Sequence, residues 1–314
     1  MCGLICECLL NPKAENGTFD ENVTALMQTE LIDTIDSVIN DKSAYAKQNA
    51  NKTVFKNEPQ ELSINGTHEE AEKVTPQTAY NAYKKILETG HVEIIGAGSS
   101  DFSIAERIFT QMFDKLNRHD ICKPGASPSA LKDHAVYVND TMPMQQAILR
   151  MYFKTREPII DRPANLLFSL ILGGMTTSRF FMNIREKQSL CYYCSCNSDR
   201  VKQTLSVVSG VEPCNIEKVR DAVLSEVKDI CENGVTEEEI KAAKLEVRNQ
   251  VSALYDSAPA IAAWYLNQIL DEKILTPEEY QDDIQKVDGE RIMAAARLYS
   301  LDTVYTLTGG NGND

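Results

Sequence analysis

The 314-residue sequence has only four histidines and one tryptophan, and it has no excess of basic residues. Lys and Arg number 32 against 46 Asp and Glu, which gives a net charge of -14. This balance argues against nucleic acid and anionic membrane surfaces as main partners, because both attract basic protein surfaces. The sequence also has no apolar run that approaches the roughly 20 residues of a membrane-spanning helix. We therefore expect no nucleic-acid partner and no membrane partner.

An export signal is also missing from the stretch MCGLICECLL, which has no basic region and is interrupted by Glu7. We therefore expect a cytoplasmic protein whose nine cysteines are reduced thiols. The pattern CYYCSC at residues 191–196 leaves open an alternative, a thiol-based metal or redox protein. Strand alternation would place Cys191 and Cys194 on opposite faces, which disfavours shared chelation and favours free thiols.

Two parts of the sequence repeat each other. The triplet Glu-Asn-Gly occurs at residues 15–17 and again at residues 232–234, and in both copies it follows a helical pattern that the glycine ends. Each copy then has a capping residue with a glutamate three positions later: Thr18 with Glu21, and Thr236 with Glu239. The patterns predict long helices at residues 20–39 and 236–255.

The repeat continues but is incomplete at its start. Residues 73–98 match residues 286–310, and each copy predicts a helix that leads into a short strand ended by glycines. Before its triplet, the second copy has room for several strands and helices, whereas only sixteen residues precede Gly17. The chain therefore contains about one and a half copies of one unit.

A loop-rich stretch, CKPGASPSALKD at residues 122–133, separates the two copies. We predict an α+β fold of two units, each an antiparallel sheet packed against helices. Residues 1–120 form a partial first unit, residues 121–133 a linker, and residues 134–314 a complete second unit. The strands of the second unit are predicted near 135–140, 145–154 and, as a pair, 190–211, with a helix at 217–231.

The stretch LGGMTTSRFFMNIREKQSLCYYCSC, residues 172–196, combines a helix end, a short helix and a strand. Two glycines end an apolar helix at residues 162–172. Arg185 then lies at the edge of the apolar face of the short helix, and Tyr192 begins the strand seven residues later. The segment TLSVVSGV, residues 204–211, is predicted to pair with this strand.

The same stretch reads Ser-Arg-Phe-Phe at residues 178–181 and Ile-Arg-Glu-Lys-Gln-Ser-Leu-Cys-Tyr at residues 184–192. It resembles the second half of insulinase-, pitrilysin- and mitochondrial processing peptidase-type zinc peptidases, whose pattern is roughly Ser-Arg-Leu-Phe and then Ile-Arg-Glu-Lys-x-x-Leu-x-Tyr. The resemblance covers nearly the whole chain, and residues 39–59 resemble bacterial members without a zinc motif. It implies duplicated metallohydrolase-like units, and it implies that Arg185 and Tyr192 hold the substrate carbonyl or the tetrahedral intermediate.

The sequence departs from catalytic members of that family in its first half. Those members carry His-x-x-Glu-His on a helix, where two histidines bind zinc and the glutamate polarises water. The four histidines here, of which no two are four residues apart, are His68, His91, His119 and His134. Glu30 lies roughly where the family places its third zinc ligand, but alone it cannot hold zinc. We expect no metal site, no cofactor and no peptidase activity of the chain alone.

The resemblance implies a non-catalytic, substrate-binding subunit. Such a subunit supplies Arg185 and Tyr192 to a homologous partner chain that carries the zinc site, and its substrate is a peptide. The alternative is a degenerate binding or assembly protein with no role in catalysis. Because an incomplete first-unit sheet leaves an unprotected edge, we also expect a homo-oligomer or docking to a partner through residues 1–100.

Overall fold

The computed structural model describes residues 2–99, 101–125, 127–271 and 273–309. It divides into two compact units. Unit 1 comprises residues 1–38, 63–125 and 254–274, and unit 2 comprises residues 39–62, 126–253 and 275–314. This division differs from the predicted domains, because residues 39–62 pack within unit 2 and residues 254–274 within unit 1. The predicted domains and linker also include positions 1, 100, 126, 272 and 310–314, which lie outside the described residues.

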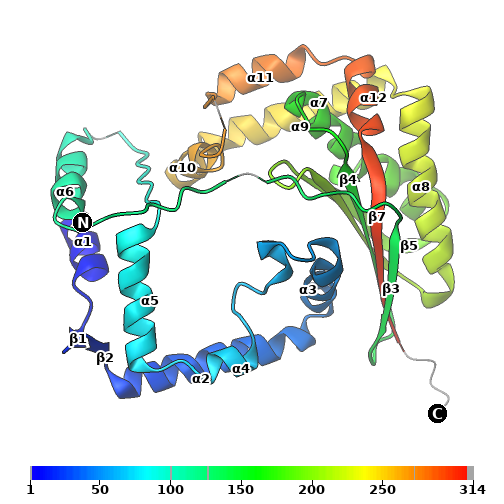
Figure 1. Cartoon of the computed structure of the whole chain (residues 1–314). Helices are drawn as coiled ribbons and strands as arrows, with labels where there is room; N and C mark the ends of the chain where they lie inside the picture. The colour runs from blue at the N-terminus through cyan, green and yellow to red at the C-terminus, as the bar shows by residue number, and fades with distance from the viewer. Residues whose placement is uncertain (1, 100, 126, 272, 310–314) are drawn as a thin grey trace. The chain divides into compact units, whose positions relative to one another are not determined.

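Unit 2 is built on a five-stranded sheet (Figure 1). In spatial order its strands are β3 (Val136–Thr141), β7 (Tyr299–Thr308), β4 (Ala147–Thr155), β6 (Thr204–Val211) and β5 (Cys191–Asp199). The four strands predicted between residues 135 and 211 are confirmed, as is the pairing of β5 with β6. The prediction of an antiparallel sheet is wrong in one place, where β3 and β7 pair in parallel. Since β7 lies between β3 and β4, which run in opposite directions, it must be parallel to one of them.

One face of this sheet packs against helices (Figure 1). The helical segments of unit 2 that complete this layer are α7 (Arg162–Ser169), η3 (Leu170–Gly174), η4 (Phe180–Lys187), α8 (Ile216–Asn233), α9 (Glu237–Leu254), α11 (Pro277–Gln285) and α12 (Gly289–Arg297). Along α8, the buried residues Val219, Val223, Val227 and Ile230 recur every three or four positions. That spacing gives the helix one apolar face, which contributes to the main core beside Leu149 of β4.

The opposite face of the sheet is covered by α3 (Lys42–Val54), which comes from the first repeat of the sequence. Ala46 and Ala50 are fully buried there, and their small side chains let the helix backbone approach the sheet closely. Phe55 meets the ring of Tyr152 edge to face, with the ring centroids 6.4 Å apart. A second, smaller core therefore joins residues 39–62 to the sheet.

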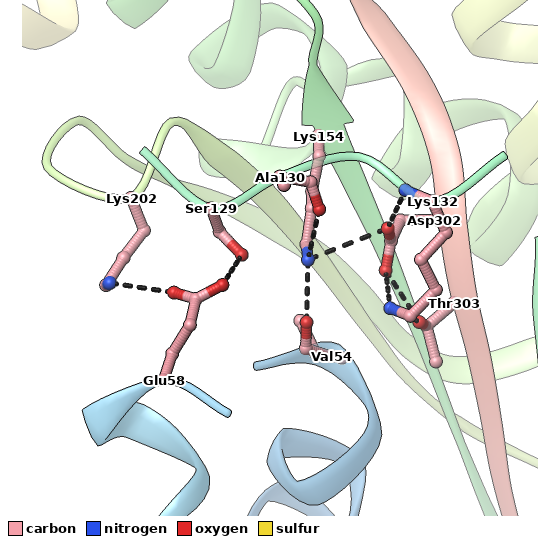
Figure 2. A network of polar contacts seen from close by, with 9 residues as sticks. All are labelled: Val54, Glu58, Ser129, Ala130, Lys132, Lys154, Lys202, Asp302 and Thr303. Carbon is pink, nitrogen blue, oxygen red and sulfur yellow. Dashed lines mark hydrogen bonds and ion pairs between the residues drawn. The ribbon is translucent and has the colours of Figure 1, made fainter. Parts of the chain in front are cut away.

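A buried ion cluster reinforces this attachment (Figure 2). The ammonium group of Lys154 donates to the carbonyl oxygens of Val54, at 2.6 Å, and Ala130, at 3.0 Å, and lies 3.6 Å from Asp302 Oδ1. Asp302 Oδ2 also accepts from Lys132 Nζ at 2.5 Å. Lys154 and Asp302 are both buried, and their contacts link the end of α3 to β4 and β7, while Lys132 is 25% exposed.

Glu58 makes a second polar link between residues 39–62 and the rest of unit 2 (Figure 2). Its carboxylate accepts from Ser129 Oγ at 2.6 Å and from Lys202 Nζ at 2.9 Å. Burial opposes the charged form of Glu58, but these two donors still hold its pKa below the ordinary value. The segment is therefore fixed at both α3 and the turn that follows it.

Unit 1 is mainly helical. Its elements are α1 (Cys2–Leu10), β1 (Ala14–Glu15), β2 (Thr18–Phe19), α2 (Glu21–Ser37), α4 (His68–Ala71), α5 (Pro76–Thr89), α6 (Ser103–Phe113) and α10 (Ala258–Leu266). The strand predicted after α5 in the first repeat is wrong, because residues 91–97 form no strand. Its counterpart in the second repeat, β7, has a strand on each side, whereas the described part of unit 1 offers no neighbouring strand to residues 91–97.

The helix starts of the two repeats differ. Thr236 and Glu239 form the predicted reciprocal cap, with N···O distances of 2.7 and 3.2 Å. The predicted cap of Thr18 with Glu21 is wrong, because Asp20 caps α2 through a 2.9 Å bond to a backbone amide three residues later. Asp20 lies two positions nearer the helix than Thr18, so its carboxylate meets the free amides first.

Candidate functional site

Arg185 lies on η4, a wide helical segment whose buried anchors are Phe180 and Ile184. Its guanidinium stacks on the ring of Phe181, 4.7 Å from the centroid, and its Nη1 lies 3.2 Å from Glu186 Oε1. The side chain remains 40% exposed. Arg185 is therefore held by neighbours on its own helix and still offers donors to solvent.

A tight turn joins η4 to β5. The amide of Ser189 donates to the carbonyl of Arg185 at 3.1 Å, and the amide of Leu190 donates to the carbonyl of Ile184 at 3.2 Å. Ser189 has a φ of 51°, in the left-handed region that non-glycine residues rarely adopt. This turn brings the chain from Arg185 to Tyr192 within a few residues.

Tyr192 lies at a β-bulge. Cys191 pairs with Val211 and Tyr193 pairs with Gly210, so Tyr192 is the extra residue in β5. Its side chain is exposed, and its hydroxyl donates to the carboxylate of Glu212. This contact with a carboxylate raises the pKa of the Tyr192 hydroxyl.

The bulge also corrects the predicted arrangement of the cysteines. Cys191, Cys194 and Cys196 all contact the main core, so they share one face of β5 and are not alternately placed. A hydrogen bond from Cys194 lowers the pKa of Cys191 to about 7, and the positive charge of Arg185 acts in the same direction. The same hydrogen bond, together with burial, raises the pKa of Cys194. Sequence alternation missed this cluster because it assumed a regular strand.

The other arginine of the motif, Arg179, has a structural position. Its guanidinium contacts Asp229 Oδ2 and Glu239 Oε1, both at 2.6 Å, and the carbonyl of Gly234 at 2.9 Å. Burial disfavours its charge, but the bonds to Glu239 and Asp229 raise its pKa. Arg179 thus fixes η4 to the turn between α8 and α9, which contains the second Glu-Asn-Gly triplet. The contact of Arg179 with Glu239 was not predicted from the sequence. The available signal was Glu239 itself, the glutamate of the capping pattern.

Arg185 and Tyr192 lie on either side of the same turn and both are partly exposed. Among the residues that the structure describes, no hydrogen bond or ion pair joins them, since each has its own acidic partner. Their joint action on a substrate therefore stays a prediction.

The histidines and Glu30 have separate surroundings. His68 Nδ1 lies 3.0 Å from Asp36 Oδ1, an interaction that raises the pKa of His68, while His91 Nε2 lies 2.6 Å from Glu93 Oε1. Glu30 is exposed on α2. Within the described ranges, no group of three or more His, Cys, Asp or Glu side chains is placed to hold a metal ion. In those same ranges, none of the helices combines the length and apolar character needed to cross a bilayer.

Known proteins resemble the chain over most of its length. Residues 73–247 match a family model described as "Peptidase M16 inactive domain". A Bacillus subtilis (strain 168) protein described as "Probable inactive metalloprotease YmfF" is 25% identical over 311 residues, which cover 98% of this chain and 73% of that protein.

Two solved structures share the fold. The crystal structure of a conserved protein from Enterococcus faecalis V583 has a TM-score of 0.87 at 23% identity, covering 100% of this chain and 74% of that one. The crystal structure of a peptidase M16 inactive domain from Pseudomonas fluorescens has a TM-score of 0.81 at 17% identity, covering 100% of this chain and 76% of that one.

Proposed function

Because the chain belongs to the M16 peptidase family and its residues 73–247 match the inactive domain of that family, we propose that it is a non-catalytic, substrate-binding subunit. In this proposal, a homologous partner chain carries the zinc site. This chain supplies Arg185 and Tyr192, and the substrate is a peptide.

The observation that carries the proposal is the exposed position of these two side chains around one turn. Phe181 stacks under the guanidinium of Arg185, and Glu212 holds the hydroxyl of Tyr192. Each side chain is thus oriented by a neighbour, which reduces the entropy lost when a substrate binds. A guanidinium has five N–H donors, so Arg185 can keep its contact with Glu186 and still donate to a substrate oxygen.

The chemistry suits an oxyanion that develops during peptide hydrolysis. A positive guanidinium and a phenol hydroxyl both donate hydrogen bonds, and loss of one such donor typically reduces transition-state stabilisation by ~3–4 kcal/mol. Because the hydroxyl of Tyr192 already donates to Glu212, it must leave that carboxylate to donate to the substrate. Glu212 would therefore hold the ring in place and release its hydroxyl on substrate binding.

The test is a two-chain enzyme reconstituted with a zinc-bearing homologue. We expect Arg185→Ala and Tyr192→Phe each to lower kcat by ~100-fold or more, with unchanged complex formation and thermal stability. Matched controls are Arg248→Ala on α9 and Tyr137→Phe on β3, which change exposed residues of the same types elsewhere in unit 2. Full activity of both site variants would contradict the proposal.

A second candidate is a binding or assembly protein with no role in catalysis. Its support is that both side chains already have acidic partners, Glu186 for Arg185 and Glu212 for Tyr192. This second function is favoured if Arg185→Ala and Tyr192→Phe both keep full activity while the complex still forms.

We also propose the cytoplasm as the location of this subunit. All nine cysteines are free, as is usual for proteins in a reducing compartment. Fractionation of the source cells tests this proposal, and recovery of the protein outside the cytoplasm contradicts it.

A further inference from the structure

Helix α2 of unit 1 exposes an apolar face that the second repeat buries. Val23 is 57% exposed and Leu26 is 56% exposed. At the offset of 217 that aligns the two Glu-Asn-Gly triplets, their counterparts on α9 are Ile240 and Ala243, which are 5% and 0% exposed. The described part of α2 buries no residue at all. Equivalent faces are thus buried in the main core of unit 2 and exposed in unit 1.

The same face borders a groove. Its volume is about 440 Å³, and its lining is largely apolar, with side chains from α2, β2, α5 and the segment before α5. The apolar lining residues are Phe19, Val23, Met27, Leu31, Val74 and Ala79. Together with the exposed apolar face of α2, this groove forms a candidate docking surface.

Residues 91–97, which follow α5, have a sequence typical of a β-strand but pair with no strand in the described part of the chain. Val92, Ile94 and Ile95 are all exposed, although β-branched residues favour sheets. At an offset of 212, their counterparts in β7 include Val304 and Leu307, which are buried between β3 and β4. Within the described ranges, residues 91–97 make no backbone hydrogen bond with another backbone group.

Charge indicates what kind of polypeptide covers this surface. Unit 1 has 9 Lys and Arg against 19 Asp and Glu, so it carries -10 of the net charge of -14. A second copy of unit 1 would place like charges together, which is unfavourable. Residues 134–215, which supply the neighbours of β7 in unit 2, instead have 9 Lys and Arg against 6 Asp and Glu.

We propose that unit 1 binds a net basic, strand-forming polypeptide of the kind that residues 134–215 form in unit 2. One strand of this partner pairs with residues 91–97, and its apolar sheet face packs on α2 and the groove beside α5. The proposal does not depend on the role of Arg185 and Tyr192, because none of its residues belongs to that site.

The probe for the test is a synthetic peptide with the sequence QAILRMYFKT, residues 146–155. It corresponds to β4, the antiparallel neighbour of β7, and it has two basic residues and no acidic one. We expect saturable binding to the full chain, with protection of the amides of residues 92–96 from hydrogen exchange. A scrambled peptide and a charge-reversed peptide, with Arg150→Glu and Lys154→Glu, should bind about tenfold more weakly or not at all.

Variants of the full chain locate the binding. Ile94→Lys should weaken binding by about tenfold or more, because it places a charge in the apolar contact. Ile160→Lys is the matched control, since Ile160 is 91% exposed in unit 2. No saturable binding, equal effects of the two variants, or unchanged exchange at residues 92–96 would each overturn the proposal. So would a stable dimer of the chain alone with those amides protected, because a second copy would then be the occupant.

Discussion

The buried ion cluster of unit 2 gives a quantitative test of how residues 39–62 are held. Replacing Asp302 with asparagine keeps the size of the side chain and removes its charge. Lys154, only 1% exposed, then loses its ion pair and keeps only the weaker influence of the Glu58 carboxylate, and Lys132 loses its partner at 2.5 Å. Removal of one partner from a buried ion pair typically lowers the free energy of unfolding by ~3–5 kcal/mol. We expect a loss in this range for Asp302→Asn.

The reverse substitution, Lys154→Met, should be milder. Methionine fills the same space without a charge, and Asp302 keeps its bond to Lys132. The carbonyls of Val54 and Ala130 lose a donor, which lowers the free energy of unfolding by about 1 kcal/mol each. Lys154→Met should therefore lose about 2 kcal/mol, and the double variant should lose less than the sum of the two single variants.

The pH dependence of stability shows whether Asp302→Asn destabilises the protein through the buried charge of Lys154 or through a packing defect. Burial lowers the pKa of Lys154 below its ordinary value of 10.5, and Asp302 partly opposes that shift. Between the folded and unfolded pKa values the unfolded state binds more protons, so stability rises with pH across this window. Asp302→Asn lowers the pKa of Lys154 in the folded state further, which widens the pH range between its folded and unfolded pKa values. The stability deficit of Asp302→Asn relative to wild type should therefore shrink as the pH rises toward 10.5. Lys154→Met lacks the titrating group, so its deficit relative to wild type should instead grow across the wild-type window.

The assay must observe unit 2 directly. The single tryptophan, Trp264, lies in unit 1, so its fluorescence does not report the unfolding of the sheet. Hydrogen exchange of the β4 and β7 amides at increasing urea gives the free energy of opening of the sheet itself. A loss below about 1 kcal/mol for Asp302→Asn, or a deficit independent of pH, would refute the buried-charge account.

Three further predictions follow from the site and its surroundings. The isolated chain should bind no stoichiometric zinc and hydrolyse no peptide, because the described residues offer no cluster of ligands; chelator-sensitive hydrolysis by a homogeneous preparation would contradict this. Cys191, with a pKa of about 7, should react with iodoacetamide near neutral pH before the buried thiols of β5, and Arg185→Ala should slow that reaction; mass spectrometry after timed labelling measures both. Arg179→Ala should lower the free energy of unfolding by about 3 kcal/mol, because it leaves Glu239 and Asp229 without their cation; equal stability of the variant in urea denaturation would show that these contacts contribute little.

The regular elements of unit 2 could be predicted from the sequence because their patterns are local. The apolar residues of α8 recur with helical spacing, and the segments at residues 147–155 and 204–211 read as strands. The Thr236 cap was also predictable, since its glutamate partner lies three residues away. Such features depend on residues close together in the chain.

Features that depend on distant partners could not be predicted in this way. Tyr192 is a bulge residue because Val211 and Gly210 pair with the residues on either side of it, so strand alternation gave the wrong face for Cys191. Residues 91–97 have a strand sequence but form no strand, since a strand requires neighbours that the described part of unit 1 lacks. The packing of α3 in unit 2 also escaped prediction, because its contacts lie about a hundred residues away in the sequence.

We propose above that this chain completes the active site of a zinc-bearing homologue. The most direct measurement is the rate of peptide hydrolysis by that homologue as this chain is titrated into it. We expect a rate that rises and saturates at one chain per partner. The double variant Arg185→Ala/Tyr192→Phe should form the same complex with a rate lower by ~100-fold or more. An unchanged rate at saturation, or full activation by the double variant, would show that this chain does not complete the active site.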